Sequence, residues 1–120
     1  MIATLLVAMM VLVAAPTPPT PPIVIHHADW EKMPNGRTFR AFYPKAARKS
    51  RIDGRVTMLC GILATGALTK CSTVDEAPLG WGFGDAALGL ASEFRMKRVT
   101  PSGQSVAGGT ITIPMVFKVP

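Results

Sequence analysis

Two short stretches rich in β-forming residues decide the fold: RVTMLCGIL from Arg55 to Leu63 and ALTKCSTVD from Ala67 to Asp75. Only Ala64, Thr65 and Gly66 separate them. Runs of this composition joined by a short turn that contains glycine are typical of a β-hairpin. The pair predicts two antiparallel strands at the centre of a small domain.

The two cysteines of the chain lie one in each of these strands. A turn centred between Thr65 and Gly66 places Cys60 opposite Cys71, close enough for local twist to permit a disulfide. In an exported protein such a pair favours a structural disulfide, with two buried free thiols as the alternative. A redox-active pair is the weakest interpretation, because no Cys-x-x-Cys motif begins a helix here.

Export is indicated by the amino-terminal sequence. From Ile2 to Ala15 the chain is uncharged and apolar except for Thr4, and as a helix this run would span about 21 Å of a roughly 30 Å hydrocarbon core. Residues 1–15 therefore predict a signal peptide, with a short uncleaved membrane anchor or a wrongly assigned start as alternatives. Residues 16–29 are expected to form a spacer, because Pro16 to Pro22 reads PTPPTPP, a polyproline II sequence.

Helices are predicted before and after the hairpin. Pro44 suits the first turn of a short helix ending at Ser50, where its missing N–H is not needed. GDAALGLAS from Gly84 to Ser92 predicts the second helix, with Asp85 stabilised near its amino terminus by the helix dipole. The apolar stripe of this helix is expected in the core, and it consists of Ala86, Leu88, Leu90 and Ala91.

The last stretch, Thr110 to Val119, alternates apolar and polar side chains and predicts a half-buried strand. Pro114 has no N–H to donate, so this strand is expected at a sheet edge with that position facing outward. Over residues 30–120 the order is helix, strand, strand, helix, strand. This order predicts an α+β domain with a three-stranded antiparallel sheet backed by helices.

The net charge and the remaining polar residues limit the classes of function that the sequence favours. The formal net charge is +6, and seven of the thirteen basic residues lie between Arg37 and Arg55. This pattern favours a solvated basic face, or else a contact surface for an acidic protein or lipid head groups. Nucleic acid binding is not favoured, since no recognition motif accompanies the charges. No metal site is predicted, because the adjacent His26 and His27 would point to opposite sides of an extended chain. No catalytic residue or cofactor site is predicted either, because the sequence shows no nucleophilic side chain paired with a general base.

Several motifs, taken in order, resemble C-terminal domains of the TonB family from about Trp30 to Pro120. They are Tyr43-Pro44, Ala46-Ala47, Ile52-Asp53-Gly54-Arg55-Val56, the hairpin turn at Gly66, Phe94-Arg95-Met96, and VAGGTITIPMVF from Val106 to Phe117. The two cysteines and the glycine pairs resemble a subgroup of short TonB-like proteins from alphaproteobacteria.

The resemblance implies a periplasmic interaction module and no enzyme. TonB carries energy from an inner-membrane complex to outer-membrane receptors, and its C-terminal domain captures an extended receptor segment, which resembles strand addition to a sheet edge. The implied partner is an outer-membrane TonB-dependent receptor. The implied contact residues are Thr110, Ile111, Thr112, Ile113, Met115, Val116 and Phe117 on the last strand, and Lys45, Arg48 and Arg51 for steering an acidic surface.

The sequence also departs from the family pattern. The apolar run is shorter than a spanning helix, the proline-rich spacer is short, and Ala46 stands where typical members have a basic contact residue. These departures argue against energy transduction, while the binding fold is still expected. Membrane contact is expected only through the amino-terminal segment, if that segment is not cleaved. The alternative is a structural or self-associating module, because an exposed edge strand also favours a homodimer.

Overall fold

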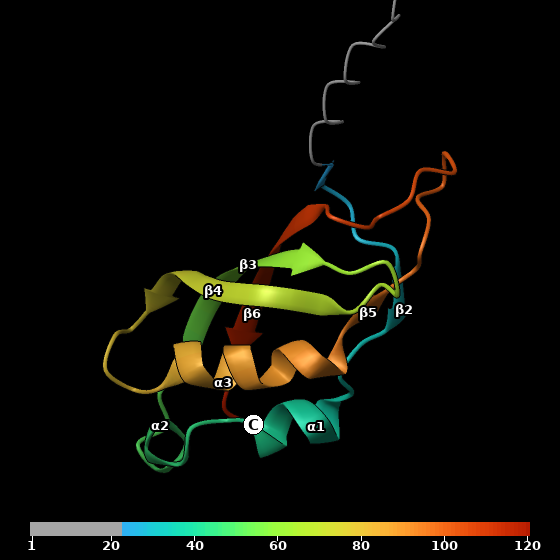
Figure 1. The fold of residues 1–120 in the computed structure, drawn as a ribbon. Helices are drawn as coiled ribbons and strands as arrows, with labels where there is room; N and C mark the ends of the chain where they lie inside the picture. Colours follow the sequence, from blue (N-terminus) through green and yellow to red (C-terminus); the bar gives the residue numbers. More distant parts are fainter. Residues whose placement is uncertain (1–22) are drawn as a thin grey trace, which may run out of the picture.

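The hairpin predicted from the sequence lies at the centre of the fold. The computed structural model of the protein describes residues 23–120, so the expected signal peptide or anchor and the proline-rich part of the spacer lie outside the described residues. β3 (Gly54–Ile62) and β4 (Leu68–Ala77) form the hairpin, and β6 (Thr110–Phe117) pairs antiparallel with β3. β1 (Val24–Ile25) pairs parallel with the start of β6, which gives the sheet order β1-β6-β3-β4 (Figure 1).

The helices follow the predicted order, with additions. α2 (Lys45–Lys49) and α3 (Phe83–Leu90) are the two predicted helices, and α3 continues into the 3-10 helix η1 (Ala91–Glu93). The elements that the sequence reasoning missed are α1 (Gly36–Ala41), the strand β1, and the small second sheet of β2 (Trp30–Lys32) and β5 (Arg95–Met96). The α+β class is therefore confirmed, but the main sheet is mixed and four-stranded, not purely antiparallel.

The folded region begins earlier than the sequence indicates. The stretch from Ile23 to Asp29, expected in the spacer, contacts the domain: Val24 lies opposite Thr110, and the carbonyl of Asp29 accepts a hydrogen bond from the Lys97 N–H at 3.0 Å. Two-residue pairings of this kind have no periodicity that a sequence pattern could reveal.

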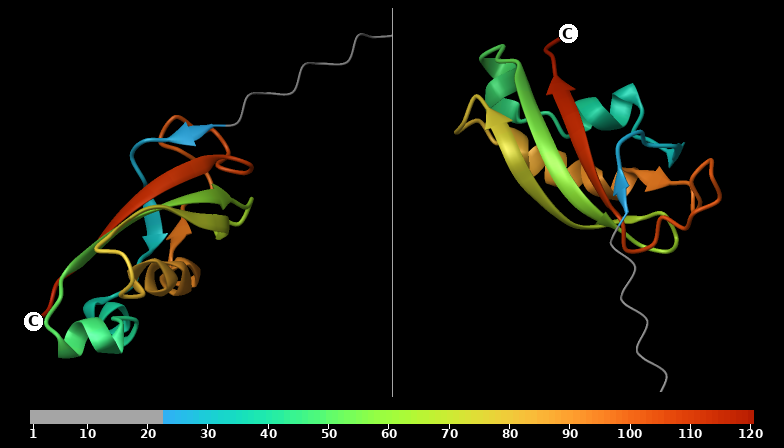
Figure 2. Two further views of the ribbon diagram at one scale, coloured as in Figure 1. Left: turned by 90° about the vertical axis from the view of Figure 1, so that its left-hand side faces the viewer. Right: turned by 90° about the horizontal axis from the view of Figure 1, so that it is seen from above.

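The helices cover one face of the sheet (Figure 2). An aromatic cluster packs between the helices and the sheet. The Phe117 ring on β6 lies 5.3 Å from the Phe83 ring on α3 and 4.7 Å from the Phe39 ring on α1. Gly54 begins β3 beneath this cluster, and a Cβ there would come within 2.4 Å of the Phe83 ring. Only glycine lets α3 approach the sheet this closely.

The buried face of α3 differs from the predicted stripe. Phe83, Ala87 and Leu90 are fully buried, whereas Leu88 is 37% exposed. The helix begins at Phe83, one residue before the predicted start, and this residue anchors an i, i+4, i+7 face. The predicted stripe was wrong at Leu88 because it grouped neighbours in sequence, and not residues on one side of the helix.

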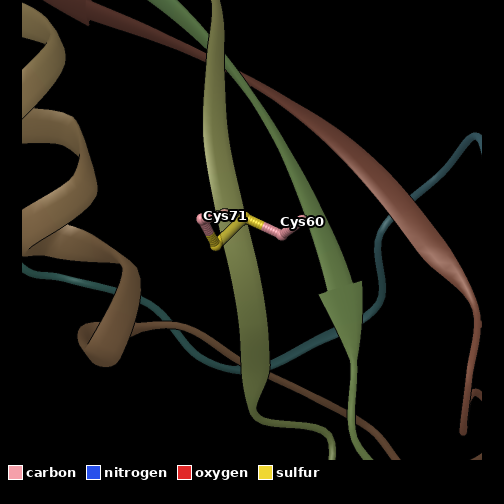
Figure 3. The surroundings of a disulfide bond; sticks show 2 residues. All are labelled: Cys60 and Cys71. Atoms are coloured by element: carbon pink, nitrogen blue, oxygen red, sulfur yellow. A yellow bond between two sulfur atoms is a disulfide. The ribbon is translucent and has the colours of Figure 1, made fainter.

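The hairpin register is correct at the cysteines and shifts on either side. Leu59 pairs with Ser72, as predicted, and Cys60 forms a disulfide with Cys71 across a Cα–Cα distance of 4.1 Å (Figure 3). β4 carries an extra residue near Lys70, whose φ is 51°, and another at Val74. These bulges were not predicted, because a turn centre fixes only one register.

Candidate functional site

One side of β6 is open along most of the strand. β1 pairs only with Thr110 and Ile111, and among residues 23–120 no strand pairs on this side from Thr112 to Phe117. The expectation of an edge strand was therefore wrong at the first two residues, where Val24 and Ile25 lie, and it holds for the rest. We call Thr112–Phe117 on this side the open edge.

Two backbone hydrogen bonds at the start of β6 fix which backbone groups face the open edge. The Thr110 N–H donates to the Ile23 carbonyl at 2.8 Å, on the β1 side, whereas the Gly109 carbonyl accepts from the Ile62 N–H at 2.9 Å, on the β3 side. Since backbone direction alternates along a strand, even-numbered residues face outward. Pro114 thus faces outward, as predicted, and Val116 supplies an N–H that points away from β3.

The predicted contact residues of β6 divide into two sets. Thr112 and Val116 are exposed, Thr110 is half-buried, and these three direct their backbone groups outward. The other four point their side chains into the core and their backbone groups toward β3, so they position the strand instead of facing a partner; they are Ile111, Ile113, Met115 and Phe117.

A groove adjoins the far end of the open edge. It encloses about 490 Å³, and its lining combines an apolar floor with two exposed cations, Arg40 and Lys118. We call it the edge groove, lined by Gly36, Phe39, Arg40, Val116, Lys118, Val119 and Pro120. Sequence reasoning missed Phe39 and Arg40 because α1 was not predicted. The signal was Asn35, whose side chain caps α1 by accepting the Thr38 N–H at 2.8 Å.

The predicted basic residues gather near the same end of the molecule. Lys45 and Arg48 lie on α2 and Arg51 follows it, all three exposed. The ion pairs found among the described residues are Lys32–Glu93 and Lys97–Asp29, neither of which involves this surface. In Figure 1 α1, α2 and the carboxyl terminus lie at one end of the domain, and β1 lies at the other. We call Lys45, Arg48 and Arg51 the basic surface.

Two side-chain hydrogen bonds fix the chain that follows the basic surface, at Ile52 and Asp53. The Asp53 carboxylate accepts the Val119 N–H at 2.8 Å, which fixes the end of the last strand. The buried Tyr43 hydroxyl donates to the Ile52 carbonyl. Burial, and secondarily the negative charge of Asp53, raises the pKa of Tyr43 above its ordinary value. The tyrosine therefore stays neutral and keeps this bond throughout the physiological range.

Residues 23–120 contain neither a metal-binding cluster nor a membrane-spanning helix. In the part of the chain that the structure describes, no group of three or more His, Cys, Asp or Glu side chains could hold a metal ion. Within the same residues, no helix is long and apolar enough to cross a membrane.

The arrangement defines a small α+β domain in which one side of β6 has no strand paired from Thr112 to Phe117 among residues 23–120. The chain belongs to the TonB C-terminal family: the family model for the Gram-negative bacterial TonB protein C-terminal region matches residues 40–119. An uncharacterized protein of Caulobacter vibrioides is 35% identical over 60 residues, which cover 50% of this chain and 60% of that protein. The chain thus matches less than two thirds of that relative's length.

Two solved structures share the fold. The NMR structure of the Pseudomonas aeruginosa TonB C-terminal domain has a TM-score of 0.55 at 22% identity, over 80% of this chain and 92% of that one. The TonB2 protein of Vibrio anguillarum has a TM-score of 0.52 at 22% identity, over 89% of this chain and 99% of that one.

Proposed function

We propose that this protein is a periplasmic TonB-like interaction module that binds an extended segment of an outer-membrane receptor by strand addition at the open edge. The observation that carries the proposal is the unpaired side of β6 from Thr112 to Phe117, within a domain of the TonB C-terminal family. The role is binding, in TonB-dependent transport, and no catalytic step is assigned to it.

Backbone groups would supply most of the affinity. An added strand gains hydrogen bonds from the Val116 N–H and to the outward carbonyls of Pro114 and Val116, each bond contributing about 0.5–1.5 kcal/mol. Pro114 offers no donor, so pairing is interrupted at its midpoint. Such an edge binds moderately and reversibly.

The edge groove would select side chains. In a strand added to β6, alternate side chains point to the helix-covered face of the sheet. One near Phe117 would enter the edge groove, where Phe39 and Val119 suit an aliphatic stem and Arg40 and Lys118 suit a carboxylate. The basic surface adds long-range attraction for an acidic receptor.

The test is an NMR titration of the oxidised, isotope-labelled protein with peptides from the periplasmic amino-terminal segments of outer-membrane receptors. Binding should shift the amide signals of Thr112 to Lys118. Val116→Pro, which removes the outward N–H, should weaken binding at least several-fold, whereas Val116→Ala keeps the donor and should bind normally. A folded domain that shows no shift at millimolar peptide would contradict receptor binding.

The second candidate is a self-associating module that uses the same edge. The observation that favours it is the open edge itself, because unpaired strands also pair with copies of their own chain. Sedimentation of the wild-type protein separates the two: a stable dimer whose formation protects the Val116 amide from exchange supports self-association.

A further inference from the structure

The chain already places one of its own segments on the edge that a partner would use. Val24 lies opposite Thr110 and Ile25 opposite Ile111, with β1 running parallel to β6. The Ile23 carbonyl accepts the Thr110 N–H, the first outward donor of β6. A partner strand that extends past the open edge to Thr110 and Ile111 would therefore overlap with β1.

The position of β1 is specific. Gly109 is buried immediately before β6, and a Cβ there would lie 2.9 Å from the Ile23 carbonyl oxygen and 3.0 Å from the Val106 carbonyl oxygen. Only a residue without a side chain lets the two backbones approach this closely. The start of β6 is thus shaped to receive an extended backbone.

The hold on β1 is nevertheless weak. The strand has two residues, and Val24 is 56% exposed. A pocket of about 230 Å³ lies against it, with apolar lining from Ile23, Ile25, Met96, Val99 and Val106. Side chains that border unfilled space lose packing contacts, and segments with few contacts open at low cost. β1 is therefore a short, weakly held strand at a position beside Gly109 that is shaped to receive an extended backbone.

We propose that the segment Ile23–Ile25 is a built-in competitor for the partner strand, an inference that rests on the proposed function. A five-residue segment can pair along Ile113–Phe117 while β1 stays in place. An eight-residue segment along Thr110–Phe117 has to displace β1, and it then pairs with Thr110 and Ile111 in place of β1. The domain therefore has two binding states, which differ in the length of the captured segment.

The competition is mild. The apparent affinity for a long segment falls by the fraction of molecules in which β1 is detached. A two-residue pairing holds β1 by only a few hydrogen bonds, and each bond corresponds to a factor of about two to ten in an equilibrium constant. Displacement should therefore weaken the binding of a long segment without preventing it.

The experiment uses the isotope-labelled full chain and two blocked peptides, Val-Thr-Val-Thr-Glu and Thr-Val-Thr-Val-Thr-Val-Thr-Glu. The valines suit the covered face of the sheet and the glutamate suits the edge groove. Both peptides should shift the Val116 amide. Only the longer one should move the Val24 and Ile25 amides to the positions of a disordered chain.

Two matched variants complete the test. The Ile23 carbonyl faces β6, so alternation places the Ile25 N–H on the same side and the Val24 N–H away from it. Ile25→Pro should loosen β1 and tighten the longer peptide by about twofold to tenfold, leaving the shorter one unchanged. Val24→Pro keeps the groups that face β6 and should change neither.

The outcomes separate this inference from the proposed function. If neither peptide shifts Val116, the open edge does not capture strands and both proposals fail. If both peptides bind while Val24 and Ile25 keep their signals, strand capture stands and the competitor is overturned. Equal affinity of Ile25→Pro and wild-type protein for the longer peptide would also overturn it.

Discussion

Pro114 lies opposite Thr57 in the β3–β6 ladder, with its backbone directed away from β3. At this position the missing N–H does not destabilise the fold, because no hydrogen bond between β3 and β6 would use it. The loss falls entirely on the open edge, where a partner would otherwise find a donor in the middle of its path.

Replacing Pro114 with alanine restores that donor. Pro114→Ala should tighten the binding of an edge-pairing peptide by about twofold to tenfold, the worth of one hydrogen bond. Peptide titration measures the affinity, and sedimentation measures self-association, which should also increase. An unchanged affinity would mean that the partner does not pair alongside Pro114.

Reversing a charge on the basic surface tests electrostatic steering. Arg48→Glu should slow association with an acidic partner by about two- to tenfold at low salt and flatten the dependence of the rate on salt. Stopped-flow fluorescence gives both quantities. Lys70→Glu makes the same charge change at an exposed residue of β4, and it serves as the control. Equal effects of the two variants would indicate net charge alone, with no role for the basic surface.

The contact between Gly54 and Phe83 makes a strong prediction for stability. Gly54→Ala introduces a Cβ within 2.4 Å of the Phe83 ring, and this overpacking should lower the free energy of unfolding by about 1–3 kcal/mol. Chemical denaturation measures the loss. In Gly36→Ala the new Cβ meets only the end of Arg40, at 3.9 Å. That control should be neutral or slightly stabilising, and a comparable loss there would remove the steric explanation.

Tyr43 should give stability a dependence on alkaline pH. Because burial and the charge of Asp53 raise its pKa in the folded state, the folded protein favours the neutral hydroxyl. Its contribution is fully present below the ordinary tyrosine pKa of about 10 and is lost as the pH rises from there through the folded-state pKa.

The matching variant is Tyr43→Phe. It should cost about 0.5–1.5 kcal/mol at neutral pH through loss of the hydrogen bond to Ile52, and the alkaline decline should become shallower. Denaturant unfolding at several pH values measures both effects. Since Tyr43 is the sole tyrosine of the chain, tyrosinate absorbance follows it directly. An equally steep decline in the variant would show that Tyr43 is not the source of the pH dependence.

The parts of the fold with a strong local signal were predictable. The two runs around Thr65-Gly66 predicted the hairpin and its disulfide, and the alternation after Thr110 predicted a half-buried strand. The hairpin depended on β-forming composition on either side of a glycine turn, and the last strand on a period of two that persists for eight residues.

The parts that depend on non-local pairing were not predictable. β1, β2 and β5 have two or three residues each, too few to display a period, and their partners are distant in sequence. The candidate site was also predicted only in part. β6 was identified, but the edge groove depends on α1, whose local signal was the Asn35 cap. The pairing of β1 with β6 is visible only in the tertiary structure.

The two outer sides of the sheet are unlike each other. On β4, the extra residues near Lys70 and at Val74 break the regular spacing of backbone groups, and bulged edges of this kind resist pairing. A strand can therefore be added on the β6 side without opening a second regular site on the β4 side. If a strand is added on the β6 side as proposed, the bulged β4 side remains a poor second site, which disfavours the head-to-tail pairing of copies that would build fibres.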